Sequence, residues 1–305
     1  KTKVKVTPML RCLRPARRAA ARPPAGNAAG SRAASSTWAP SGLVAVYKPA
    51  GWTSFDVVGR IRGVLEKHIR GLSPEYTAPR VSGVKRVKSK RLKVGHGGTL
   101  DPSATGVLVV GIGEACKDLT SYLAGSKGYT CVAELGSATD TLDGDGAVVE
   151  SKAWDHVTRD AIDAALVHFR GDIFQIPPMY SALHHNGQRL HELARAGVEV
   201  ERPARAAVIH RLQLMPEAEA LPRFGLEVEC GGGTYIRSLV ADVAVNVGTV
   251  GYMVSLERTK QGPFSLDHCI GKDQWTYEEL MANAVLCAEV LARSLEEAKA
   301  QAAAS

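Results

Sequence analysis

The spacing of apolar residues changes along this chain, and each spacing predicts one type of element. Short apolar runs bounded by glycine, proline or polar residues are typical of β-strands. Such runs predict strands at residues 43–47, 107–112, 129–135, 207–214 and 224–230. Apolar residues three and four positions apart are typical of helices with one buried face. That spacing predicts helices at residues 54–68, 117–123, 158–169, 190–196, 234–247 and 276–304.

Two of these helices also carry a start signal. Thr53 and Asp56, and again Thr276 and Glu279, are spaced as a capping box, in which each side chain accepts from the backbone N–H of the other. The strands and helices follow one another in a hairpin-like and mixed order. A doubly wound parallel sheet would require a regular β–α–β alternation, so the order favours the α+β class.

Residues 41–270 form the predicted body of the protein, and three segments differ from it. Residues 1–40 are rich in Ala, Arg, Ser and Pro and have no apolar periodicity, so we expect them to be disordered. Residues 67–93 are a basic insertion, and an irregular loop is favoured there by Gly71, Pro74, Pro79 and Gly83. Residues 271–305 are predicted to be a helical extension.

The excess of positive charge lies in two of these segments, and the rest of the chain carries a net charge of −10 (7 − 9 − 8). Residues 1–40 hold nine Lys and Arg and no acid, and residues 67–93 hold nine with Glu75 as their single acid. Clustered positive charge attracts phosphate backbones, which predicts a nucleic-acid partner. An arginine-rich, acid-free start is also typical of a transit peptide, which predicts an organellar location, with the mitochondrion favoured over the plastid. The alternatives are an RNA-binding arm on a nuclear or cytoplasmic protein, and untranslated sequence before Met9.

Several other classes of site are not supported by the sequence. The six cysteines are scattered without a C-x-x-C pair, so neither a disulfide framework nor a zinc site is expected. No run of about 18 apolar residues predicts a membrane span. Gly111 and Gly113 are followed by Cys116 where a dinucleotide fingerprint needs glycine, and residues 139–146 have the wrong spacing for a calcium loop and favour a turn. We therefore expect no cofactor and no metal.

The clearest candidate chemistry lies in the stretch GHGGTLDP at residues 95–102. Glycines let a backbone approach a ligand closely, and Pro102 biases the preceding Asp101 towards extended geometry. His96 can stack on a base, donate a hydrogen bond or titrate near neutral pH. A lone carboxylate beside a basic stripe indicates an acid delivered to a polyanion, and that stripe consists of Lys85, Arg86, Lys88, Lys90, Arg91 and Lys93.

This stretch, extended to GHGGTLDPSATGVL, resembles the catalytic motif of TruB-type tRNA pseudouridine synthases. Further motifs of that family follow in order, so that the resemblance spans roughly residues 43–266. They are YKPAGWTS at 47–54, KGY at 127–129, LG at 135–136, TDTLD at 139–143, QIPPMYSAL at 175–183, GTYIRS at 233–238, and LERT at 256–259 with GPF at 262–264. The resemblance implies a pseudouridine synthase fold, with a mixed, mainly antiparallel central sheet, flanking helices and a cleft across it.

Three residues are assigned to catalysis. Pseudouridine formation breaks the C1′–N1 bond of a uridine, turns the base and rejoins it through C5. Asp101 is our nucleophile, because an aspartate is ionised at neutral pH; without the motif, a plain turn residue would be preferred. A buried carboxylate needs a cationic partner, for which Arg237 at a helix start is the candidate. Tyr129 is expected to stack on the flipped uracil and to relay the C5 proton.

The remaining candidates are assigned to substrate binding. Leu256 is expected to form the apolar wall of the base pocket, and His96 to fill the space that the flipped uridine leaves or to contact that nucleotide. Lys48 and Tyr235 lie within matching motifs and are expected to contact substrate. Outside these motifs, His96 and Leu256 would more often be structural. The basic stripe of residues 85–93 is expected to contact phosphates.

The resemblance thus implies a stand-alone, monomeric enzyme that modifies the T-loop uridine of tRNA (position 55) without a cofactor or guide RNA, and leaves mRNA open as a further target. Bacterial members carry an additional C-terminal RNA-binding (PUA) domain. Residues 271–305 show no strand pattern, so we expect the eukaryotic branch that lacks it. The alternatives are a guide-dependent synthase of a box H/ACA particle and a noncatalytic tRNA-folding chaperone.

Overall fold

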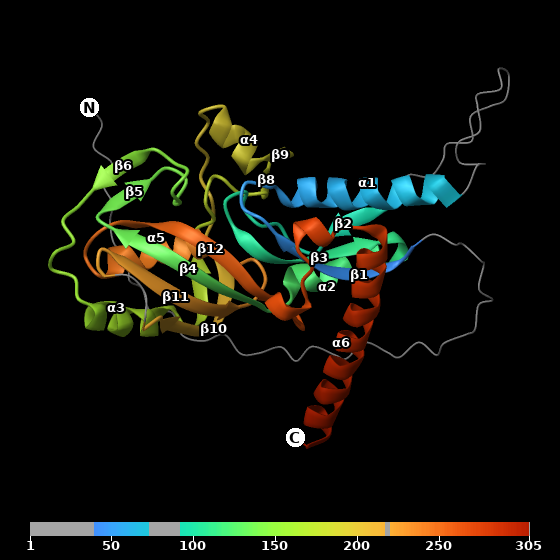
Figure 1. The fold of residues 1–305 in the computed structure, drawn as a ribbon. Coiled ribbons are helices and arrows are strands. Elements are labelled where there is room, and N and C mark those ends of the chain that lie inside the picture. Colours follow the sequence, from blue (N-terminus) through green and yellow to red (C-terminus); the bar gives the residue numbers. More distant parts are fainter. Residues whose placement is uncertain (1–39, 73–91, 217–219, 305) are drawn as a thin grey trace. The chain divides into compact units, whose positions relative to one another are not determined.

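A nine-stranded sheet is the centre of the compact unit formed by Ala39–Ser305 (Figure 1). The computed structural model describes residues 40–72, 92–216 and 220–304. Neighbouring strands are antiparallel except β3 and β12, which are parallel. Their order is β1 (Gly42–Lys48), β3 (Thr105–Ile112), β12 (Gly251–Gln261), β4 (Lys127–Leu135), β11 (Arg223–Cys230), β10 (Arg205–Leu214) and β7 (Gly171–Gln175). The predicted α+β class, with its mainly antiparallel sheet, is confirmed.

Two short strands also pair with strands of this sheet. β2 (Val94–His96) pairs with the last residues of β3, and β13 (Phe264–Ser265) pairs with the end of β12. Two small hairpins stand outside the sheet, formed by β5 (Ser137–Thr139) with β6 (Val148–Ser151) and by β8 (His184–His185) with β9 (Gln188–Arg189). β9 leads directly into the short helix α4 (Leu190–Arg195).

The apolar runs of β1 and β3 are continuous because both faces of these strands are buried. Alternate residues point to opposite faces of a strand. Val44 and Val46 therefore pack with α1 (Ser54–Leu72) and the start of α6 (Tyr277–Ala304). Leu43 and Ala45 pack on the other face with α2 (Leu119–Ala124) and α6. The side chain of Asn283 in α6 accepts from Ala45 N–H at 2.9 Å and donates to His268 O at 2.8 Å, which fixes α6 to β1.

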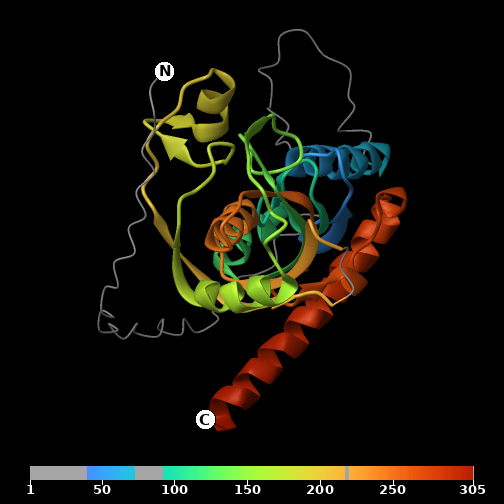
Figure 2. The ribbon, with the colours of Figure 1, turned by 90° about the vertical axis from the view of Figure 1, so that its left-hand side faces the viewer.

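The other half of the sheet is covered by α3 (Arg159–Leu166) and α5 (Ile236–Asn246). Figure 2 shows α5 nearly end-on within the curve of the strands. Its buried residues Leu239, Val240 and Val243 belong to one apolar cluster with β4, β10 and β11. The first turn of α5 faces the loops at the middle of the sheet, where the candidate site lies.

Helix starts agree with the sequence better than helix ends. At α1, Thr53 N–H donates to Asp56 at 2.8 Å and Asp56 N–H donates to the Thr53 hydroxyl at 3.1 Å, so the predicted capping box is present. The Thr276 hydroxyl accepts from Glu279 N–H at α6. The helix predicted at 158–169 is shorter, because its last three residues form a 3₁₀ turn. The helix predicted at 117–123 begins two residues later, after another 3₁₀ turn at Gly113–Lys117.

The strand β12 was not predicted, although it joins the two halves of the sheet. Polar residues on it are buried, among them Arg258 and Gln261, so its sequence lacks an apolar run. Its parallel pairing with β3 brings Gly106 against Arg258. Gly106 has a φ of +101°, and a Cβ there would lie 2.2 Å from the main-chain oxygen of Arg258. This close approach requires glycine.

Some sequence predictions lie outside the described residues. These are the targeting segment of residues 1–40, apart from its last residue, and five members of the basic stripe: Lys85, Arg86, Lys88, Lys90 and Arg91. Residues 73–91 of the predicted insertion also lie outside the described residues. The irregular conformation expected from Gly71 was wrong for residues 67–72, because α1 continues to Leu72 and a single glycine is tolerated in a helix. The sixth member, Lys93, is described and is exposed just before β2.

Candidate active site

Asp101 lies in the loop that connects β2 to β3, and its neighbours are fixed from several elements. Leu100 N–H donates to the buried hydroxyl of Ser54, at the start of α1, at 3.0 Å. On the other side, the ammonium of Lys48 donates to the carbonyl of Pro102 at 3.0 Å. The Asp101 side chain itself keeps 30% of its surface exposed. The backbone around the candidate nucleophile is therefore held while its carboxylate faces a cavity.

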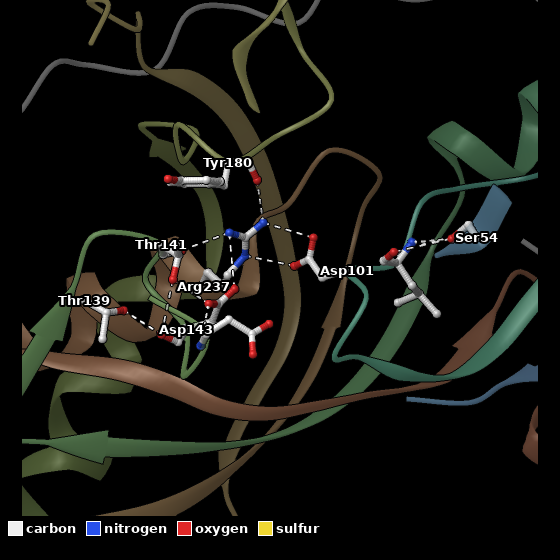
Figure 3. A network of polar contacts seen from close by, with 9 residues as sticks. Ser54, Asp101, Thr139, Thr141, Asp143, Tyr180 and Arg237 are labelled. Carbon is white, nitrogen blue, oxygen red and sulfur yellow. Dashed lines mark hydrogen bonds and ion pairs between the residues drawn. The ribbon is translucent and has the colours of Figure 1, made fainter. Parts of the chain in front are cut away.

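Arg237 meets this carboxylate from the first turn of α5. Its Nε lies 2.9 Å from Asp101 Oδ2, and its second terminal nitrogen donates to Asp101 Oδ1 at 3.0 Å (Figure 3). Two parallel contacts of this kind fix the orientation of a carboxylate as well as its position. The guanidinium also donates to the carbonyls of Thr141 and Tyr180, at 2.9 and 2.8 Å, and lies 3.5 Å from Asp143. The contact expected between Asp101 and Arg237 is therefore present, and the Arg237 side chain in it is nearly buried.

The charge of Asp101 is set by two opposing effects. Burial is the larger one and raises the pKa of the carboxyl, while the positive charge of Arg237 acts in the opposite direction. Asp143 also raises this pKa through its negative charge. Arg237 therefore opposes the effect of burial and favours the ionised form of the Asp101 carboxyl.

Two hollows meet at the Asp101–Arg237 pair. The smaller one, of about 310 Å³, is also lined by Tyr129, Tyr235 and Leu256, so it unites five of the predicted site residues. Tyr129 on β4 and Leu256 on β12 are nearly buried and form apolar surface there. Burial raises the pKa of the Tyr129 phenol, which keeps it protonated at neutral pH. This hollow matches the chemistry of a pocket for a planar base. We call it the base hollow.

The larger hollow, of about 600 Å³, is lined by the same pair. We call it the outer hollow. Its lining comes from the start of α1, the loop at residues 140–147, and the β9–α4 segment. Basic and hydrogen-bonding side chains at this surface include Arg189, His191 and Arg195. The β9–α4 segment and the 139–146 loop thus take part in the site, although the sequence favoured only a turn for the latter.

Two predicted residues line neither hollow. Lys48, expected to contact substrate, is wholly buried, and its ammonium donates to the carbonyls of Pro49, Trp52 and Pro102. It supports the Asp101 loop and lines neither hollow. His96 is half-buried, accepts weakly from Gly98 N–H at 3.4 Å, and packs edge-to-face with Phe55 at 5.4 Å between ring centres. Burial lowers the pKa of His96, so its imidazole is neutral at pH 7.

The sequence did not identify three further candidates. They are polar residues that lie in the matching motifs but were given no role there. Arg258 is fully buried and donates to Val107 O at 2.7 Å and to Gly98 O at 3.2 Å. Lys127 lines the base hollow and donates to two carbonyls at the end of α2, and burial lowers its pKa to about 8. Asp143 contacts Arg237. The motif matches at residues 127–129, 139–143 and 256–259 were the sequence signal that could have identified these three residues.

Comparison with known proteins gives this arrangement a family. The model of the TruB family pseudouridylate synthase N-terminal domain matches residues 84–236. A mouse protein named pseudouridylate synthase TRUB1 is 46% identical over 257 residues, covering 84% of this chain and 73% of that protein. The chain belongs to the TruB family. A tRNA pseudouridine synthase B of Lactococcus lactis is 42% identical to it, covering 72% of this chain and 61% of the bacterial protein.

The fold of this TruB-family chain also resembles a solved structure. The crystal structure of a Cbf5–Nop10–Gar1 complex matches with a TM-score of 0.53 and 26% identity, covering 76% of this chain. The chain spans about half the length of that structure, 53%. Among the described residues of this family member, no helix is long and apolar enough to cross a membrane.

Proposed function

We propose that this chain converts uridine to pseudouridine in tRNA, at position 55 of the T-loop, with Asp101 as the nucleophile. The bidentate contact between Asp101 and Arg237 at the mouth of an apolar hollow carries this proposal. Relatives named for pseudouridine synthesis at 42–46% identity support the reaction. The position on tRNA rests on the motif resemblance.

The reaction rearranges bonds without adding or losing atoms. An oxygen of Asp101 forms a covalent bond to the nucleoside as the C1′–N1 bond breaks, which holds the substrate while the base turns. The C5–C1′ bond then forms as the bond to Asp101 breaks. C5 loses its proton, and N1, which has lost its bond to C1′, gains one, so atoms and charge balance. Arg237 occupies one edge of the carboxylate and leaves the remaining lone pairs of both oxygens for the substrate. Because the Tyr129 phenol stays protonated, it would relay this proton rather than accept it as a phenolate.

The target uridine must leave its stack to reach Asp101, which costs a few kcal/mol unless new contacts replace the old ones. In this proposal the base enters the base hollow, between the Tyr129 ring and the Leu256 side chain. His96 fills the space that the base leaves, or contacts the flipped nucleotide. A neutral imidazole suits either role, because it can stack without carrying an unpaired charge into the RNA.

Asp101→Asn provides the decisive test on a purified protein and a T-arm RNA hairpin. The change keeps the shape of the side chain and removes its charge, so isomerisation should be abolished while RNA affinity stays within a few-fold. Asp163→Asn, on the exposed face of α3, is the matched control and should retain activity. Substantial turnover by Asp101→Asn would exclude Asp101 as the nucleophile. A wild-type protein that refolds tRNA without forming pseudouridine would favour the chaperone alternative.

Two further proposals concern segments of which only Pro40 and residues 92–93 are described. Lys85, Arg86, Lys88, Lys90, Arg91 and Lys93 contact RNA phosphates in this proposal, so neutralising them should flatten the salt dependence of binding by roughly one unit per lost contact. An unchanged slope would contradict it.

Residues 1–40 act as a mitochondrial address. A fluorescent protein carrying them should enter mitochondria, whereas a diffuse signal together with weaker RNA binding by the truncated enzyme would indicate a binding arm.

A further inference from the structure

Phe55 is an exposed aromatic side chain at the candidate active site. Two of the five phenylalanines are largely exposed: Phe55 at 65% and Phe174 at 76%. Single exposed apolar residues are common on protein surfaces, so exposure alone carries no argument. The difference between the two is their location. Phe55 lines the outer hollow together with Asp101 and Arg237, whereas Phe174 lies on the edge strand β7 and lines neither hollow.

The position of Phe55 is tied to that of the nucleophile. Phe55 is the second residue of α1, inside the capping box of Thr53 and Asp56, so its backbone is fixed at a helix start. The preceding residue, Ser54, accepts from Leu100 N–H at 3.0 Å, and Leu100 precedes Asp101 (Figure 3). His96 packs edge-to-face against the Phe55 ring, with an angle of 88° between the planes. A ring held in this way loses little conformational freedom when a ligand binds to it.

The outer hollow is separate from the place proposed for the uracil. The base hollow contains Tyr129 and Leu256, and the outer hollow contains neither. Both include Asp101 and Arg237, so a nucleotide bound in the outer hollow would be close along the RNA chain to the one being isomerised. Arg189 and Arg195 in the same hollow supply cationic groups of the kind that contact phosphates.

We propose that Phe55 is a base-stacking residue that binds an unpaired nucleotide adjacent to the target uridine. The proposal rests on the proposed function, because it takes RNA as the ligand. When the target base leaves its stack, a neighbouring base loses a stacking partner, and an aromatic ring can replace it. Stacking is tolerant of sequence, since every base has a π-face. Phe55 therefore contributes affinity for a loop conformation and not recognition of one base.

The first experiment compares Phe55→Ala with Phe174→Ala, which is the same substitution at a similarly exposed site. On a T-arm hairpin, Phe55→Ala should raise the KM and the Kd about 5- to 100-fold and leave kcat within about twofold. Phe174→Ala should change neither. Phe55→Trp should bind as well as the wild type, whereas Phe55→Leu, which is apolar but not aromatic, should not. An unchanged Kd for Phe55→Ala, or full rescue by leucine, would overturn the proposal.

The second experiment uses hairpins in which the nucleotide on the 5′ or the 3′ side of the target is abasic. One of these RNAs should bind the wild type and Phe55→Ala with affinities that agree within about twofold, because the stacking partner is already gone. Equal losses on the intact hairpin and on both abasic hairpins would show that Phe55 acts only through the Asp101 loop, which overturns the proposal. Failure of the proposed function is seen separately, as a wild-type protein that binds the intact hairpin without forming pseudouridine.

Discussion

Replacing Arg237 by methionine should measure how strongly the Asp101 carboxylate depends on its partner. The side chain of Arg237 is 6% exposed, and its removal would leave the carboxylates of Asp101 and Asp143 and the carbonyls of Thr141 and Tyr180 without this donor. Removing one partner of a buried ion pair costs about 3–5 kcal/mol. We expect a loss of that size in the free energy of unfolding, measured by urea titration at pH 7.5, together with loss of isomerisation.

A double-mutant cycle with Asp101→Asn separates pairing from packing. If Arg237 is needed because it neutralises Asp101, then Asp101→Asn should cost less in the Arg237→Met background than in the wild type, with a coupling energy of about 1–3 kcal/mol. The two substitutions would be uncoupled if their effects added within about 0.5 kcal/mol. Such a result would refute the view that the pair is an energetic unit.

The same variant predicts a dependence on pH with a definite sign. Burial already raises the pKa of Asp101 above its ordinary value of 3.8, and without Arg237 nothing of equal strength opposes that rise. The native state then binds more protons than the unfolded chain in the window above pH 3.8, up to the raised pKa. The free energy of unfolding therefore increases as the pH falls through this window. The defect of Arg237→Met relative to the wild type should therefore shrink as the pH falls from the Asp101 pKa in the variant towards the lower Asp101 pKa in the wild type, and a defect that does not change with pH would contradict the argument.

Two further predictions concern the support of the site. Burial lowers the pKa of Lys48 from 10.5 to about 8, so the unfolded chain binds more protons between these values and the free energy of unfolding should rise with pH across this window. Lys48→Met should remove part of that rise, and an identical pH slope in both proteins would contradict it. Gly106→Ala should disrupt the β3–β12 pairing and lower the Tm strongly, because a Cβ there would lie 2.2 Å from a backbone oxygen. Gly171→Ala is the control, since it also has positive φ but no atom within 4 Å, and should cost only about 1–2 kcal/mol.

The parts of the fold that the sequence predicts are those set by local interactions. The capping box of Thr53 and Asp56, the apolar runs of β1 and β3 and the helix α6 each follow from residues within a few positions of one another. β12 could not be predicted in this way, because the burial of Arg258 depends on carbonyls of Gly98 and Val107 that lie more than a hundred residues away in the chain.

The site shows the same division. The motif resemblance identified Asp101 and Arg237, and the structure brings them together across 136 positions of sequence. The motif resemblance did not show that the Lys48 ammonium donates its hydrogen bonds to three backbone carbonyls. A lysine in a motif has the same sequence signature whether it faces substrate or supports a loop. The contact of Asp143 with Arg237 was missed because an acidic residue in a turn is usually exposed. Asp143 becomes an ion-pair partner only because the fold brings Arg237 next to it.

The loop at residues 97–102 has more structural support than a surface turn requires. Its backbone is held by side chains of β1, α1 and β12, namely Lys48, Ser54, Arg258 and Gln261. None of these four contacts involves the Asp101 carboxylate, which is left to Arg237 and the cavity. Positioning of a reacting group within fractions of an ångström is a large part of catalytic rate, and it depends on such supporting contacts. The fold therefore places long-range hydrogen bonds where they fix the backbone on both sides of Asp101, and the carboxylate itself is paired with Arg237.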